Sequence, residues 1–276
     1  MCKNKSHIKN NIKTQINEYN TISKSFCELI KIIRTLRSPE GCPWDREQTL
    51  YSLKNHFIEE AYELVDALDN RDIDNIKEEL GDLLLHIVIH SVIAEEDGYF
   101  NLNEVIQEIS EKLIRRHPHV FSDLKVDNTD DVMKHWEAIK VNEGKTRKSI
   151  FDGIPKSLPS VQNSYKIQKR AAKTGFNWNS EKECMEKVDK ELSELKSALE
   201  SGDKNHIEHE FGDTFFALIN LARIHNIDPD ESIRKVNQRF KKRFNYIEKK
   251  LSDNDISLND AESHEIKKLW EEAKKQ

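Results

Sequence analysis

Apolar residues recur at helical spacing through most of this chain. Between residues 53 and 68 they follow i, i+3, i+4 steps, which predicts an amphipathic helix with one buried face. Residues 73–94 are apolar around more of the circumference, which indicates a second helix in a central position. The segment between them, DNRD at 69–72, is short. Two long helices joined by a short turn predict an antiparallel helical hairpin.

The same pattern occurs again in the second half of the chain. Residues 181–200 and 205–226 predict a second hairpin around SGDK, and further helices are predicted at 103–116 and 230–251. Shifting the sequence by 131 positions, from Glu60 to Glu191, aligns identical residues in the two hairpins. These pairs include Glu60/Glu191, Glu63/Glu194, Glu79/Glu210, Gly81/Gly212 and Asp82/Asp213. The chain is therefore interpreted as an internal duplication.

Composition marks the boundary between the two copies. The segment 144–160, GKTRKSIFDGIPKSLPS, contains the Gly and Pro residues that end helices. We expect a polar N-terminal extension at 1–24, a first helical domain at 25–143, a linker at 144–160 and a second domain at 161–276. Each hairpin needs further apolar surface to cover it, from the other copy or from a second chain. The expected fold is all-α, with two tandem helical units, four-helix-bundle packing and completion by dimerisation.

The overall composition narrows the class of protein. Charged residues make up 34% of the 276 residues and hydrophobic residues 36%, with 8 Gly and 6 Pro, which favours long helices. The net charge of -6 argues against a nucleic-acid-binding protein. The longest apolar run, 83–94, is too short for a membrane span. The four cysteines form no CxxC pair, so we expect a reduced, cytoplasmic protein.

Acidic residues lie at helical spacing on the predicted hairpins. Glu60 and Glu63 are three apart on one helix, Glu79 and Asp82 are three apart on the next, and both pairs are similarly distant from the turn. Four carboxylates are therefore expected to converge, with Glu59 beside them. A solvated acidic face is the alternative, but the recurrence of the pattern favours a cation site. Closely spaced carboxylates repel one another, and ligands that are all oxygen favour Mg²⁺ or Mn²⁺.

Basic residues suited to phosphate binding lie on the third predicted helix of each copy. Lys112 and Arg116, and likewise Arg239 and Arg243, are four apart and share a helix face. A solvated basic stripe is the alternative. Trp136 and Trp270 either stack on a nucleobase or pack in the core; we keep both interpretations open.

Two pairs of residues on the apolar helices could serve either packing or function. His86 and His90 do not recur in the second copy, so we interpret them as packed histidines and not as metal ligands. Gly81 and Gly212 interrupt good helices, at a cost of about 1 kcal/mol each against Ala. Close approach of a helix or substrate, or packing alone, would account for them.

Several motifs resemble one known family. EEAYELVDAL and EELGDLLLH, with CPWD upstream and RRHPHVF downstream, resemble the MazG family of nucleoside triphosphate pyrophosphohydrolases. HEFGDTFFALINLARIH and NQRFKKRFNYIE look like the C-terminal copy of the two-copy members. The resemblance covers roughly residues 25–275. It implies an all-α hydrolase, usually a dimer, that cleaves a nucleoside triphosphate to the monophosphate and diphosphate with Mg²⁺.

The resemblance also implies residue roles. The metal-binding acids would be Glu59, Glu60, Glu63, Glu79, Asp82, Glu191, Glu194, Glu210 and Asp213. By the resemblance, the substrate-binding residues would be Arg239, Arg243 and Trp270. From their own chemistry and spacing, we add Lys112 and Arg116 in the first copy and Lys190 and Glu191 on the second hairpin to the expected substrate-binding residues. Lys190 replaces the first Glu of the family's EExxE motif, and its ammonium could hold a triphosphate oxygen. Glu194 or Glu63 would accept the proton of the attacking water, and the sequence does not separate a base from a ligand.

The sequence leaves the active copy and the substrate open. The third helix of the first copy carries acids at positions 104, 108 and 111, so the second copy is the better expected nucleotide site. Alternatives are a related pyrophosphohydrolase acting on dUTP or phosphoribosyl-ATP, and a non-catalytic helical scaffold or nucleotide-binding regulator. The expected partners are a nucleoside triphosphate and a second copy of the chain, with no nucleic acid and no membrane.

Overall fold

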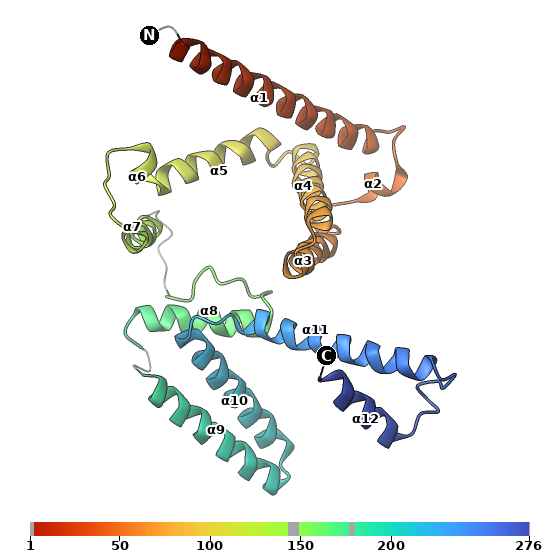
Figure 1. Ribbon diagram of the computed structural model, residues 1–276. Helices are drawn as coiled ribbons and strands as arrows, with labels where there is room; N and C mark the ends of the chain where they lie inside the picture. Colours follow the sequence, from red (N-terminus) through yellow and green to blue (C-terminus); the bar gives the residue numbers. More distant parts are fainter. Residues whose placement is uncertain (1–2, 143–148, 177–179, 276) are drawn as a thin grey trace. The chain divides into compact units, whose positions relative to one another are not determined.

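The chain folds into helices that are grouped in two compact units. The computed structural model describes residues 3–142, 149–176 and 180–275, and all regular secondary structure in these ranges is helical (Figure 1). The units are Met1–Gly144 and Lys145–Gln276, which divide inside the predicted linker. Residues 144–148 of that linker lie outside the described ranges. The all-α prediction is confirmed, and within the described ranges no helix combines the length and the apolar character needed to cross a membrane.

The first unit is built around a helical hairpin. Its helices are α1 (Lys3–Leu36), α2 (Pro43–Glu47), α3 (Lys54–Asn70), α4 (Ile73–Glu96), α5 (Leu102–Arg116), α6 (Pro118–Phe121) and α7 (Thr129–Asn142). Helices α3 and α4 form the predicted hairpin. Arg71 makes the turn in the left-handed conformation, with φ 55°, and Asp72 caps α4 by accepting a hydrogen bond from the backbone N–H of Asn75. Helix α1 runs without a break across the expected domain boundary at 24/25.

The core of the first unit lies between α1 and the second half of α4. Ile33 of α1 and Val88, Val92 and Ile93 of α4 are almost completely buried. Ion pairs reinforce this contact at its edge, including one of 2.6 Å between Arg37 Nη2 and Glu96 Oε2. The prediction of a central second helix therefore holds for the half of α4 that follows the acidic residues. In the half that bears the acids, Glu79 and Asp82 are partly exposed.

The second unit repeats the hairpin. Its helices are α8 (Ser160–Lys173), α9 (Glu181–Ser201), α10 (Lys204–Ile224), α11 (Pro229–Ser252) and α12 (Ser263–Ala273). Helices α9 and α10 meet at Gly202, whose φ of 71° favours glycine. Helix α8 packs on α10, where the side chain of Gln168 donates a hydrogen bond of 2.7 Å to the carbonyl of Phe216. Helix α11 contacts α8 and α10 in its first part and packs along α12 in its second part.

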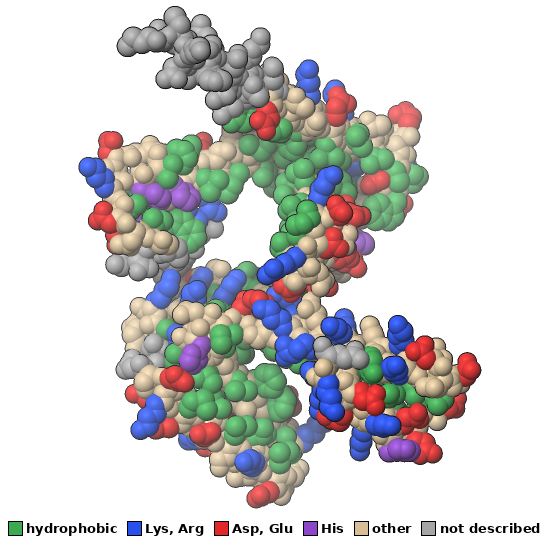
Figure 2. Space-filling model, in the orientation of Figure 1, with side chains coloured by type: hydrophobic (Ala, Val, Ile, Leu, Met, Phe, Trp, Pro, Cys, Tyr) green, Lys and Arg blue, Asp and Glu red, His purple; other side chains and the backbone are tan. Residues whose placement is uncertain are grey.

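Both hairpins leave a stripe of large apolar side chains exposed at equivalent positions. In α4 the stripe contains Leu80, Leu84 and Ile87, which are 53%, 38% and 46% exposed. In α10 the corresponding residues are Phe211, Phe215 and Leu218, with 53%, 43% and 44% exposed. Figure 2 shows hydrophobic side chains gathered over the α9–α10 hairpin. We call these two sets the α4 stripe and the α10 stripe; each is apolar surface that monomeric proteins rarely leave uncovered.

Candidate functional site

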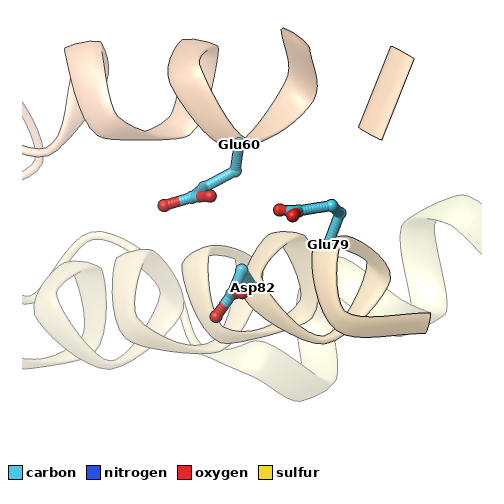
Figure 3. A group of neighbouring side chains, drawn as sticks. All are labelled: Glu60, Glu79 and Asp82. Atoms are coloured by element: carbon cyan, nitrogen blue, oxygen red, sulfur yellow. The ribbon is translucent and has the colours of Figure 1, made fainter. Parts of the chain in front are cut away.

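Three of the predicted acids meet between the helices of the first hairpin. Glu60 extends from α3 toward Glu79 of α4, and Asp82 lies one turn further along α4 (Figure 3). Each offers a carboxylate oxygen, and these oxygens all lie within 4.8 Å of one another. The Oε2 atom of Glu79 is buried and has no hydrogen-bond partner among the described residues. We call Glu60, Glu79 and Asp82 the first acid group; Glu59 and Glu63 are exposed and lie outside it.

The first acid group carries uncompensated negative charge. Burial, followed by the charges of Glu63 and Asp82, raises the pKa of Glu60. Burial, followed by the charges of Glu63, Glu60 and Asp82, raises the pKa of Glu79. Glu63 therefore acts on the group electrostatically although it is not a member. Among the described residues the ion pairs of this hairpin do not include a member of the group, so a bound cation would relieve the repulsion.

The raised pKa values give a stability prediction. A carboxyl whose pKa is higher in the folded than in the unfolded protein destabilises the fold once it is ionised. The stability of the metal-free first unit should therefore fall as the pH rises from the ordinary value of 4.5 through the raised pKa values. Glu79→Gln should raise the melting temperature at pH 7 in a chelator by on the order of a few degrees and flatten this pH dependence. Thermal melts of this variant, with the exposed Glu40→Gln as control, measure the effect; equal shifts in the two variants would contradict it.

The second hairpin brings together an overlapping but different set of acids. Glu191 and Glu194 of α9 and Glu210 of α10 offer oxygens within 4.8 Å of one another. The side chain of Glu191 is only 2% exposed. We call these three residues the second acid group. Asp213 lies outside it and is half exposed, so the fourth acid differs between the copies, Glu63 in the first and Asp213 in the second.

Cations of the chain itself surround the second acid group. Lys190 Nζ lies 2.8 Å from Glu194 Oε1 and 3.9 Å from Glu191 Oε1, and Lys187 also forms an ion pair with Glu191. The hydrogen bond that Lys190 donates to Glu194 raises the pKa of Lys190 and lowers the pKa of Glu194. His206 lies 3.3 Å from Glu210. Lys187 and His206 were missed by the sequence interpretation, although their spacing of four residues from an acid was available as a signal.

Arg243 of α11 and Trp270 of α12, two of the predicted nucleotide-binding residues, contact each other. The guanidinium carbon of Arg243 is 5.8 Å from the ring centroid of Trp270, and Phe240 packs 5.2 Å from the same ring. Arg116 and Trp136 repeat this arrangement in the first unit, at 5.6 Å. Both tryptophans are half-buried under an arginine. Within the described part of the second unit, neither Arg239 nor Arg243 forms an ion pair with a member of the second acid group.

The remaining predicted residues have clear environments. His86 is 6% exposed and packs edge-on against Phe57, with ring centroids 5.8 Å apart, as expected of a packed histidine. At both Gly81 and Gly212 an added Cβ would meet no atom of the described chain within 4 Å. Among the described residues, no neighbour explains either glycine, and their role stays a prediction.

Comparison with known proteins supplies the family. The model of the MazG nucleotide pyrophosphohydrolase domain matches residues 48–121, and that of phosphoribosyl-ATP pyrophosphohydrolase matches residues 162–240. The nucleoside triphosphate pyrophosphohydrolase/pyrophosphatase MazG of Thermotoga maritima is 42% identical over 250 residues, which are 90% of this chain and 95% of that protein. The nucleoside triphosphate pyrophosphohydrolase of Escherichia coli K12 is 37% identical over 253 residues, 90% of this chain and 96% of that protein.

One more protein sequence and one solved structure are similar to this chain. The uncharacterized protein YabN of Bacillus subtilis is 44% identical over 261 residues, which are 94% of this chain but 53% of that protein. The chain thus spans about half the length of this relative. A crystal structure of a mazG-related protein from Thermotoga maritima aligns with 43% of this chain and 98% of its own, with 28% identity and a TM-score of 0.37.

Proposed function

Since the chain belongs to the MazG family of nucleoside triphosphate pyrophosphohydrolases, which are hydrolases acting on acid anhydrides, we propose that it hydrolyses a nucleoside triphosphate to the monophosphate and diphosphate. The observation that carries the proposal is the presence, in each hairpin, of three carboxylates within 4.8 Å of one another. Among the described residues, Glu79 Oε2 of the first group is buried without a hydrogen-bond partner, and the side chain of Glu191 in the second group is 2% exposed.

A divalent cation fits these residues. Buried, closely spaced carboxylates are costly unless a cation joins them, and the donors are all oxygen. Such donor sets favour Mg²⁺, with Mn²⁺ as an alternative, and Mg²⁺ usually shares its coordination shell with water and substrate phosphates. Glu60, Glu79 and Asp82 would hold the ion in the first unit, and Glu191, Glu194 and Glu210 in the second.

The other residues of the chain have roles beside the ion. When bound, the ion would lower the pKa of a water and neutralise the charge that develops at the α-phosphorus. Glu194 or Glu63 would take the proton from the attacking water. Arg239, Arg243 and Lys190 would bind phosphate oxygens of the substrate, with Trp270 beside them. The second unit is the better candidate for the nucleotide because its basic residues are more numerous.

A second copy of the chain would complete this site. Among the described residues, no ion pair joins Arg239 or Arg243 of α11 to the second acid group, so we infer that they would meet the nucleotide from a partner. The α4 and α10 stripes provide apolar surface for such a partner, and the α10 stripe continues into an apolar groove of about 470 Å³ that is lined by Ile233 of α11. We therefore propose a homodimer in which two hairpins pack into a four-helix bundle.

Phosphoribosyl-ATP is the second candidate substrate. Residues 162–240 match the phosphoribosyl-ATP pyrophosphohydrolase model, and this range contains the complete second acid group. This compound presents the same triphosphate, so only the pocket for its base and second ribose would distinguish it. The two candidates therefore share the chemistry at the α-phosphorus.

Diphosphate release from a panel of substrates tests the proposal. The panel contains the ribo- and deoxyribonucleoside triphosphates, dUTP and phosphoribosyl-ATP, each with Mg²⁺, with Mn²⁺ and with a chelator. The expected result is metal-dependent release of diphosphate from at least one nucleoside triphosphate. Release from phosphoribosyl-ATP alone would favour the second candidate, and release from none of them would support a non-catalytic scaffold.

A further inference from the structure

The two acid groups differ in the charges that surround them. Each of the four predicted site acids on the second hairpin has a basic or imidazole side chain one helical turn before it. These pairs are Lys187/Glu191, Lys190/Glu194, His206/Glu210 and His209/Asp213. The residues at the equivalent positions of the first hairpin are His56, Glu59, Asn75 and Glu78. The duplication has therefore kept the acids and changed their counter-charges.

The lysines contact two of the carboxylates that would hold an ion. Glu191 is 2% exposed, so its charge must be paired, and Lys187 supplies the ion pair. Lys190 lies close to Glu191 and Glu194 together, at 3.9 and 2.8 Å, and thus bridges two members of the second acid group. The ammonium of Lys187 lies beside Glu191 Oε1. The two ammonium groups therefore supply the positive charge that a divalent ion would otherwise supply to these carboxylates.

We propose that Lys187 and Lys190 act as counterions that keep a free divalent cation out of the second acid group. This group then binds its ion only together with a triphosphate. The first acid group, which lacks such lysines, binds the ion without a triphosphate. An ammonium a few ångströms from a divalent ion repels it, and both compete for the same carboxylates. Triphosphate oxygens accept hydrogen bonds from ammonium groups and would draw the lysines away from Glu191 and Glu194. Ion and triphosphate then raise each other's affinity, because such coupling is reciprocal.

This inference deepens the proposed function and rests on its assignment of the ion to the carboxylates. Its test measures binding without turnover, so it can fail while diphosphate release succeeds. Mn²⁺ is the probe, because the electron paramagnetic resonance signal of the free ion reports the unbound concentration. The ligand is a nucleoside triphosphate with a methylene bridge between the α- and β-phosphates.

The titration uses the full chain with Glu79→Gln and Asp82→Asn, which removes two members of the first acid group. In this background Mn²⁺ alone should bind weakly, and the triphosphate analogue should restore tight binding. Adding Lys187→Gln and Lys190→Gln should increase the affinity for Mn²⁺ alone by at least roughly tenfold. Adding Glu210→Gln as well should abolish that gain, which places the ion in the second acid group.

A matched variant separates the effect of the lysine charges from the effect of changing the side chains. Lys187→Arg with Lys190→Arg retains both charges and should show no gain in affinity for Mn²⁺ alone. The side chains of Lys187 and Lys190 are 38% and 59% exposed, so their replacement should preserve the helical circular dichroism, which is checked first. Tight binding of Mn²⁺ alone while both lysines are present overturns the proposal. An unchanged affinity in the folded glutamine variant overturns it too.

Discussion

Replacing Glu210 by Gln and Asp213 by Asn is expected to lower the metal-dependent rate of diphosphate release by at least roughly 10³-fold. Both changes keep the shape of the side chain and remove its charge, so the second hairpin would lose a member of its acid group and the neighbouring acid of α10. Without these charges the ion and the phosphates would not be held together. Initial rates at saturating nucleotide measure the effect.

The same replacement in the first hairpin shows how the activity is divided between the copies. Glu79→Gln with Asp82→Asn should reduce the rate less, because the better nucleotide site is expected in the second unit. Glu208→Gln removes an exposed acid of α10 that lies outside the acid group and should leave the rate unchanged. If diphosphate release survived the loss of both pairs of acids, the assignment of the ion to these carboxylates would be wrong.

A charge on the α10 stripe should dissociate the proposed homodimer. Phe215 is 43% exposed in the single chain and also lines the apolar groove beside α10 and α11. Burying its exposed ring against a partner would contribute on the order of 1–2 kcal/mol, and a carboxylate there would add the cost of burying a charge. Phe215→Glu should therefore weaken self-association by roughly 100-fold or more, as measured by sedimentation over a range of protein concentrations.

The conservative change Phe215→Leu is the matched control and should leave the dimer intact. Because α11 is proposed to act on the acid group of a partner, Phe215→Glu should also lose activity in parallel with dissociation, and a high protein concentration should restore part of it. A wild-type chain that sediments as a monomer at all concentrations would refute the dimer.

The sequence predicted the hairpins and the existence of the acid sites because both depend on local spacing. Helical periodicity and short turns set the limits of α3, α4, α9 and α10 to within a few residues. The spacing also predicted that Glu60, Glu79 and Asp82 would meet. It could not predict that Glu63 would lie outside the first group and Asp213 outside the second, because the relative rotation of two packed helices depends on side-chain packing.

Other features depended on contacts that spacing does not report. Each tryptophan packs under an arginine of its own unit. Predicting this contact would require knowing how the chain runs between α5 and α7 and between α11 and α12. The continuation of α1 across residue 24 was missed because its first turns are polar. The counter-charges around the second acid group were visible in the sequence as i, i+4 pairs, but only Lys190 was interpreted.

Each acid group belongs entirely to one pair of consecutive helices. Such a pair closes a short loop and loses little chain entropy, so we expect it to form early during folding. In the first unit, early closure would bring mutually repelling carboxylates together before α1 covers the other end of α4. In the second hairpin, lysine and histidine side chains lie beside the acids, so we expect this hairpin to close without repulsion between carboxylates. The two halves of the chain are thus expected to acquire structure in a different order as the supply of divalent ions changes, although they share one architecture.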